Sequence, residues 1–209
     1  MTDEQCPRPL DLPLDEIELP PGFHRPDPYK PIDLERSRRR VPPEATVKGM
    51  FFTSLEEEVR SRGFDLASRR LPPFLDYPMT ELLDLYEEAA RVSHAGLPTY
   101  EAMRRLARPA FRVFSDSLVG RTVFGVIGRD VQRVLGLAAR AWPHAANVGK
   151  LEVERIDEQT ALVRASEFYL TEPVAVGIAE GVLLADGRRG LVAARMSSPI
   201  DGEFWIRWA

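Results

Sequence analysis

The C-terminal stretch decides the fold, and it opens with an alternating segment, Lys150–Asp157 (KLEVERID). A second alternating segment, Thr160–Phe168 (TALVRASEF), follows after an acidic turn. The apolar run Pro173–Leu184 (PVAVGIAEGVLL) is typical of a helix, and two more strand-like segments close the chain, Leu191–Met196 (LVAARM) and Glu203–Trp208 (EFWIRW). The order strand, strand, helix, strand, strand predicts a half-buried antiparallel sheet with one helix on its face.

The chain before this sheet carries helical patterns of apolar residues, which we expect to supply the rest of the core. The sequence therefore predicts an α+β fold, with an N-terminal helical layer packed on a C-terminal, mostly antiparallel four-stranded sheet. Pro109 should split one helical pattern at Arg108. We expect a first helix at Leu55–Arg62, after a capping box of Ser54 and Glu57, and a second from a Thr80 cap to Val92. A third should run from a Thr99 cap to Leu118, with the break at Arg108. Two more are expected at Val119–Ile127 and from Asp130 to Trp142, where Pro143 should end the last helix.

Composition and length bound the class of protein. The chain has 209 residues and is 44% hydrophobic, which is enough for a core in one domain with an appendage. The net charge of −4 and the pI of about 5.5 argue against general nucleic-acid binding. Cys6 is the single cysteine, so no intrachain disulfide can form and we expect a cytoplasmic protein. No signal-peptide pattern is present and no apolar run reaches ~18 residues, so we expect no membrane span.

The N-terminal segment differs in composition from the rest. Residues 1–45 hold ten of the eighteen prolines, and their apolar residues are scattered singly. Such a segment buries too little to offset its ordering entropy, so we expect a Pro-rich, largely disordered arm followed by a single α+β domain at 46–209. A short basic cluster in the arm could contact a phosphate or an acidic partner, or it could be a solvated run beside Asp33 and Glu35. The residues of that candidate partner-binding cluster are Arg36, Arg38, Arg39 and Arg40.

The sequence contains no residue set typical of a catalytic or metal site, so we expect a non-enzymatic protein without a cofactor. The three histidines, His24, His94 and His144, lack the spacing of a zinc site. His94 could ligate haem from the end of its helix, or it could be a helix C-terminal residue favoured by the helix dipole. Gly177 and Gly181 could suggest a phosphate loop, but no Lys-Ser/Thr follows, and close packing explains them better.

Several short motifs carry a resemblance to known families. The segments Glu167–Leu170, Pro173–Leu184, Leu191–Met196 and Asp201–Phe204 resemble the end of vinyl-4-reductase-type domains. Those domains share a small-molecule-binding fold with haem–nitric-oxide-binding domains and TRAPP trafficking subunits. Three further segments make the chain similar to an uncharacterised paralogous family known mainly from myxobacteria, and these are Val47–Phe52, Leu106–Gly120 and Asp201–Trp208. The resemblance covers residues 46–208 and implies this fold, a homodimer and a pocket.

The sequence departs from these families where they bind cofactors. Some vinyl-4-reductase domains carry C-terminal cysteines that suit a metal, and this chain has none there. Haem–nitric-oxide-binding domains use a Tyr-x-Ser-x-Arg motif for the haem carboxylates, and the sequence contains no such motif. The resemblance therefore implies the fold and no cofactor.

Two main hypotheses of function remain, beside an enzyme of unknown class that rests on fold analogy alone. The first is a cytoplasmic regulatory or scaffolding protein that acts through protein–protein contacts, with the Pro-rich arm as its docking segment. The alternative is a sensor that binds a small apolar ligand between the helical layer and the sheet. The segment Val119–Ile127 is apolar on nearly every side, so it is either the buried central helix of the helical layer or a face that lines a pocket or a homodimer interface. The candidate residues of that face are Val119, Val123, Phe124 and Ile127.

Overall fold

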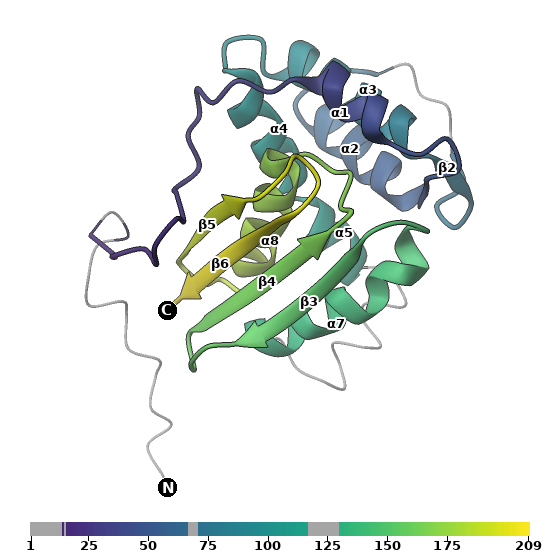
Figure 1. Cartoon of the computed structure of the whole chain (residues 1–209). Coiled ribbons are helices and arrows are strands. Elements are labelled where there is room, and N and C mark those ends of the chain that lie inside the picture. Colours follow the sequence, from purple (N-terminus) through teal and green to yellow (C-terminus); the bar gives the residue numbers. More distant parts are fainter. Residues whose placement is uncertain (1–13, 15, 67–70, 117–129) are drawn as a thin grey trace, which may run out of the picture.

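The C-terminal strands form one antiparallel sheet, as the alternating segments predict. In the computed structural model, which describes residues 14, 16–66, 71–116 and 130–209, the strand order is β3-β4-β6-β5 (Figure 1). The fold is therefore α+β with an antiparallel four-stranded sheet, and this part of the prediction is confirmed. The strands are β3 (Lys150–Arg155), β4 (Thr160–Ser166), β5 (Gly190–Met196) and β6 (Gly202–Trp208).

Cross-strand pairing separates the two faces of this sheet. Residues that pair directly point to the same face, and the next pair points to the other. The row Ala161, Ile206, Val192 lies on the inner face, which belongs to the main core. The next row, Leu162, Trp205 and Ala193, lies on the outer face and forms a separate small apolar cluster with Ile17.

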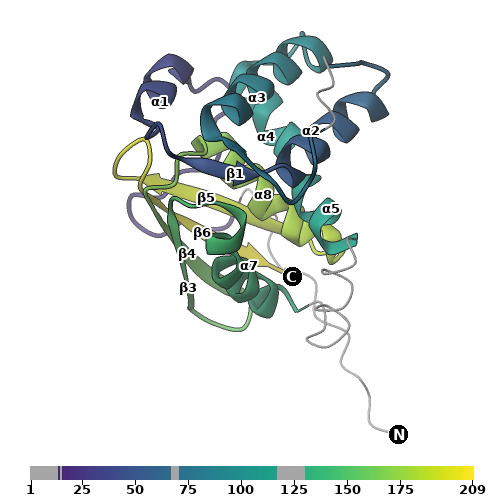
Figure 2. The same cartoon turned by 90° about the vertical axis from the view of Figure 1, so that its right-hand side faces the viewer.

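Two helices cover the inner face. Helix α7 (Val131–Ala145) packs along β3, and α8 (Glu172–Ala185) packs on β5 and β6. Figure 2 shows both helices on the same side of the sheet. Asp130 caps α7 as expected, because its side chain accepts a hydrogen bond from the Arg133 backbone N–H at 2.9 Å.

The remaining helices form a layer on the far side of α8. Helix α4 approaches α8 closely because Gly177 and Gly181 have no side chain: a Cβ at these positions would lie 2.2 Å from the Arg104 carbonyl oxygen and 2.1 Å from that of Arg108. Close helix packing is therefore the role of this glycine pair. The elements of the layer are α1 (Leu34–Arg40), α2 (Met50–Ser61), α3 (Met79–Ser93), α4 (Thr99–Ala107) and α5 (Ala110–Asp116), with a small ribbon of β1 (Thr46–Lys48) and β2 (Asp76–Pro78).

Helix boundaries show where local signals were misleading. The break expected at Pro109 is confirmed, since α4 ends at Ala107 and α5 begins at Ala110. The capping box at Ser54 is wrong: α2 begins at Met50, because burying Phe52 with the core outweighs a serine cap, and Ser54 is buried inside the helix. Two other boundaries are wrong. Helix α3 begins at Met79, so Thr80 lies inside it, and α7 continues past Pro143, whose missing N–H removes only one bond near the last turn.

The N-terminal arm is the largest difference from the expectation of disorder. From residue 16 onward it lies against the domain, and we call residues 16–30 the strap (Figure 1). Ile17 is buried on the outer face, His24 forms a β-bridge with Ala194, and α1 buries Leu34. Ile17, Leu19 and Phe23 of the strap reach the apolar cluster on the sheet because the segment is extended. The expected helix Val119–Ile127, with its candidate face Val119, Val123, Phe124 and Ile127, lies outside the described residues.

Candidate functional site

An apolar cavity of about 470 Å³ lies between the inner face of the sheet and the helices α2, α5, α7 and α8. Helix α8 contributes Ala175, Ile178, Ala179 and Val182 to its wall. These positions follow the spacing i, i+3, i+4, i+7, so they form one face of the helix. The sheet contributes Val153, Val163 and Ile206 on the opposite side. The cavity therefore lies between the helices on one side and the sheet on the other.

A cluster of aromatic rings shapes one part of the wall. Trp142 of α7 meets Phe168 at a ring-centroid distance of 4.8 Å and Phe51 of α2 at 6.1 Å. The Trp142 indole Nε1 donates a hydrogen bond to the Val148 carbonyl at 2.9 Å, which fixes the ring although it is buried. The cavity is therefore bounded by a fixed cluster of aromatic rings on one side and by the aliphatic face of α8 on the other.

The chemistry of the lining favours a ligand that is mostly hydrocarbon. Small-molecule pockets are typically ~300–1,000 Å³ and apolar, with few polar groups that set orientation. Among the described lining residues, the polar side chains are Ser54 and His144, and none is Lys, Arg, Asp or Glu. A charged group placed among these residues would lose its hydration without a counter-charge.

The described lining does not match the needs of haem. Haem iron takes an axial ligand such as His, Met, Cys or Tyr, and its two carboxylates need polar or cationic partners. The described lining offers Met50 and His144 as side chains able to bind iron, and His144 is exposed at the end of α7. It offers no arginine or lysine for the carboxylates. Within the described ranges, no three His, Cys, Asp or Glu side chains gather as a metal site requires.

His94, the residue singled out as a haem ligand or a helix-end residue, lies at the C-terminus of α3 and outside the described lining. Its Nδ1 lies 2.9 Å from the Ser93 hydroxyl. Burial lowers the pKa of His94, and the nearby charges of Arg62 and Arg105 lower it further. His94 lies at the end of its helix, as expected. Its lowered pKa favours the neutral imidazole, so attraction between an imidazolium charge and the helix dipole is not what mainly sets its protonation state.

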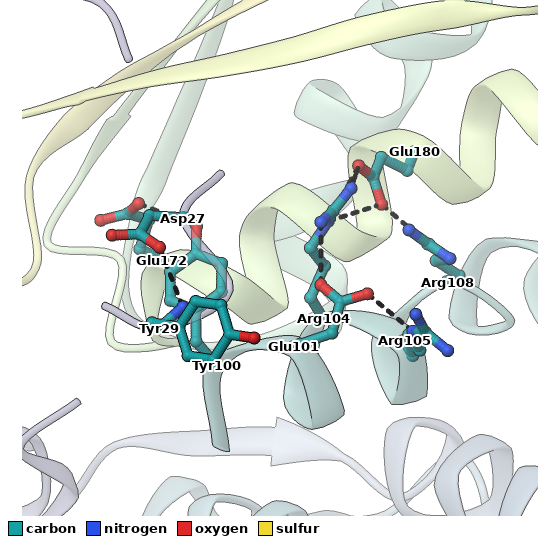
Figure 3. A network of polar contacts seen from close by, with 9 residues as sticks. All are labelled: Asp27, Tyr29, Tyr100, Glu101, Arg104, Arg105, Arg108, Glu172 and Glu180. Atoms are coloured by element: carbon teal, nitrogen blue, oxygen red, sulfur yellow. Dashed lines mark hydrogen bonds and ion pairs between the residues drawn. The ribbon is translucent and has the colours of Figure 1, made fainter. Parts of the chain in front are cut away.

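A network of ion pairs joins α4 to α8 beside the cavity (Figure 3). Glu180 accepts hydrogen bonds from Arg104 Nη2 at 2.6 Å and from Arg108 Nε at 2.8 Å. Glu101 accepts from Arg104 Nη1 at 2.9 Å and from Arg105 Nε at 2.6 Å. Burial alone would raise the pKa of Glu101, but the Arg105 hydrogen bond and the arginine charges outweigh it, so the pKa is lowered.

A second polar cluster surrounds Glu172, the first residue of α8. Its carboxylate accepts a hydrogen bond from the Tyr100 hydroxyl at 2.9 Å, pairs with the Lys30 ammonium and lies 3.2 Å from His24 Nε2. The Glu172 side chain is 9% exposed. Burial raises the pKa of Tyr100, and the charge of Glu172 and its hydrogen bond raise it further. We call this group of four residues the Glu172 latch, because it ties the strap to α4 and α8.

The predicted arginine cluster lies on a single short helix, and its role in binding a partner stays a prediction. All four residues lie on α1, where Arg38 Nε bonds Asp84 at 2.6 Å and its Nη2 bonds Glu87 of α3. Arg39 pairs with Glu35 of its own helix. Burial alone would lower the pKa of Arg38, but the two carboxylates outweigh it and raise the pKa. Arg38 therefore fastens α1 to the helical layer, while Arg36, Arg39 and Arg40 lie on the same short helix.

Sequence reasoning missed both the cavity wall and the latch. Trp142 appeared as the end of a helix and Glu172 was not singled out. A weak signal was present for Glu172, since an acidic residue before Pro173 suits a helix N-terminus. The spacing of Glu101, Arg104 and Arg105 also suited i,i+3 and i,i+4 pairs, but the second partner of Arg104, Glu180, lies 76 residues away.

The chain belongs to a family described as "Protein of unknown function (DUF2378)", whose model matches residues 40–209. No curated protein matched the sequence. The fold is that of H-NOX structures, so the haem–nitric-oxide-binding part of the expected resemblance is confirmed at the level of the fold. The likeness to vinyl-4-reductase and TRAPP proteins, and the link to myxobacteria, stay predictions.

Three of these H-NOX structures show how closely the fold agrees. The Fe(II) unliganded H-NOX protein from K. algicida is 14% identical, with a TM-score of 0.58 over 78% of this chain and 96% of that one. The Fe(II)NO form from S. oneidensis is 13% identical, with a TM-score of 0.58 over 78% and 99%. An oxygen-binding H-NOX domain related to soluble guanylate cyclases is 12% identical, with a TM-score of 0.54 over 77% and 92%.

Proposed function

We propose that this protein is a sensor domain that binds a small, largely apolar molecule in the cavity between α7, α8 and the sheet. The observation that carries the proposal is the apolar cavity of about 470 Å³. The H-NOX structures support it, since they include an NO-ligated Fe(II) form and an oxygen complex in the same fold. Burial of apolar ligand surface would drive binding at roughly 25 cal/mol per Å².

The ligand class follows from the lining. A neutral molecule rich in hydrocarbon fits the described walls, and the two polar side chains, Ser54 and His144, would orient a single polar group. We do not propose haem, because the described lining lacks cationic partners for its carboxylates. A sensor of this kind differs from the H-NOX structures in its ligand while sharing their fold.

The test uses the neutral fluorescent probe N-phenyl-1-naphthylamine. We expect saturable binding to the wild-type protein and a loss of about tenfold or more in affinity for Ala179→Phe, which fills the cavity from α8. Ala138→Phe fills it from α7 and should act likewise. The control is Leu184→Phe on the same helix, whose side chain is 61% exposed and outside the described lining. Equal affinity in all four proteins, with unchanged circular dichroism, would refute the cavity as the site.

The regulatory or scaffolding hypothesis is less well supported. Its docking segment was the Pro-rich arm, and residues 16–45 of that arm lie on this domain itself. A protein partner, a homodimer and a cytoplasmic location stay predictions. Among the described residues, no helix has the length and apolar character needed to cross a membrane.

A further inference from the structure

We propose that the strap, residues 16–30, is a releasable cover on the outer face of the sheet, and that filling the cavity releases it through α8. This inference rests on the proposed ligand binding, and it adds the output to which binding would be coupled. It requires that the strap be held by few contacts, that its anchor be on α8, and that α8 also line the cavity.

The strap covers an apolar patch that lies on the face opposite the cavity. Ile17 is buried against Leu162, Ala193 and Trp205, with Phe23 packed at the margin. A small patch of this kind, once uncovered, would expose a tryptophan and a leucine on a strand surface, which is the usual character of a contact site. Release of the strap would therefore expose this apolar patch to solvent.

Few backbone bonds hold the strap to the sheet. It meets β5 in a single isolated bridge, where His24 and Ala194 exchange two hydrogen bonds of 2.9 Å each. The Arg195 guanidinium adds a bond to the Pro21 carbonyl at 3.0 Å and lies 4.5 Å from the centroid of the Phe23 ring. By comparison, β5 pairs with β6 along seven residue positions. A segment attached by one bridge belongs to the part of a protein that opens first.

The Glu172 latch also holds the strap, and it is attached to α8 itself. Lys30 and His24 come from the strap, Tyr100 comes from α4, and all three meet the Glu172 carboxylate. Of the four latch residues, only Glu172 belongs to α8, so a movement of the N-terminus of α8 would pull its carboxylate away from Lys30, His24 and Tyr100. Because Lys30 is partly exposed, its ammonium would regain water when the pair opens, while the Glu172 carboxylate would keep its hydrogen bond from Tyr100 only if α8 did not move.

Helix α8 connects the latch to the cavity. Ala175, the first cavity residue of α8, is three positions after Glu172, which is less than one turn along the helix. On another face α8 is held by α4 at Gly177 and Gly181 and by the arginine pairs of Glu180. A ligand that presses on the cavity face therefore tilts α8 about this fixed contact and moves its N-terminus with Glu172.

Thermodynamic linkage sets what must be observed. A ligand releases the strap only to the extent that it binds the released form more tightly, and the coupling acts equally in both directions. Opening of the strap raises probe affinity by the same factor by which the probe raises strap opening, so weakening the latch should tighten probe binding by up to that factor.

The experiment measures amide hydrogen exchange of residues 16–30 in the full chain, with and without saturating N-phenyl-1-naphthylamine. We expect exchange to rise on the order of fivefold or more with the probe. Lys30→Gln and Glu172→Gln should raise it without the probe and tighten probe binding. Glu158→Gln, in the exposed turn between β3 and β4, is the matched control and should change neither.

The possible results are distinct. If the probe binds and exchange of the strap is unchanged, the coupling is refuted while the cavity function stands. If the probe does not bind the wild-type protein at all, the proposed function fails and the inference fails with it. If Glu172→Gln does not fold, Lys30→Gln still decides, because it removes the same ion pair from the partly exposed side. Unchanged exchange in Lys30→Gln would show that the latch does not hold the strap.

Discussion

The two faces of the sheet differ in what covers them. The inner face meets α7 and α8, and its rows of Val, Ile, Ala and Phe join the main core around a cavity. The outer face has a buried apolar row of Leu162, Ala193 and Trp205, which the strap covers with Ile17. It also carries a charged row of Arg164, Glu203 and Arg195. The inner face therefore belongs to the main core, whereas the outer face is covered by an extended segment that pairs with β5 at one isolated bridge.

Helix α8 contacts the elements that cover both faces of the sheet. Helix α8 buries its cavity face toward the inner sheet, yet its first residue, Glu172, is bound by Lys30 of the strap. The strap passes from the outer face around the β5 edge to reach it. A connection between the two faces thus runs around the sheet edge instead of through the sheet.

The largest effect should come from matched truncations on the two faces. Ile206→Ala removes a side chain that is 0% exposed on the inner face, and we expect it to lower the free energy of unfolding by about 2–5 kcal/mol. Leu191→Ala on the outer face removes a partly buried side chain beside the strap and should cost about 1 kcal/mol. Urea unfolding at neutral pH measures both. Equal losses would mean that the two faces contribute alike to stability.

A second, smaller effect should follow from removing the strap. A chain that begins at Pro31 loses the burial of Ile17, which contributes about 1.5–3 kcal/mol, but keeps α1 and its Arg38 pairs. We expect one cooperative thermal transition at a lower temperature. A broad, non-cooperative transition would instead place the strap in the folding core.

The smallest effect concerns pH and the ion pairs between α4 and α8. The lowered pKa of Glu101 means that its stabilising contribution is fully present above its ordinary pKa of 4.5. The contribution is lost as the pH falls through the lowered folded-state pKa, because the unfolded chain takes up the proton first. The difference in unfolding free energy between wild type and Glu101→Gln should therefore shrink from neutral pH to about pH 4 and below.

Glu158→Gln is the control for this pH series, because Glu158 lies in an exposed turn. Its difference from wild type should be small at both pH values. A constant difference for Glu101→Gln across the series would mean that its carboxylate contributes by packing alone.

Local patterns were sufficient to predict the order of strands and helix along the C-terminal part of the chain. The two-residue alternation of Lys150–Asp157 and the apolar run after Pro173 each report which side of an element is buried, and this depends on near neighbours in the chain. Pro109 and Asp130 marked a break and a cap for the same reason, since a missing N–H or a capping oxygen acts within one turn. For Ser54, burial of the neighbouring Phe52 outweighed the local cap.

Tertiary structure alone decided the cavity, the strap and the latch. The cavity is lined by residues of α2, α5, α7, α8 and the sheet, so no single segment encodes it. The strap appeared disordered in sequence because its apolar residues are sparse, and it is ordered because a face made by distant strands receives them. Lys30 and Glu172 are 142 residues apart, so their ion pair exists only once α8 has docked beside β5. Sequence by itself determined the strands and the helix of the C-terminal region, whereas long-range packing determined that α1 and the strap lie on the domain and which surfaces and charges the elements bring together.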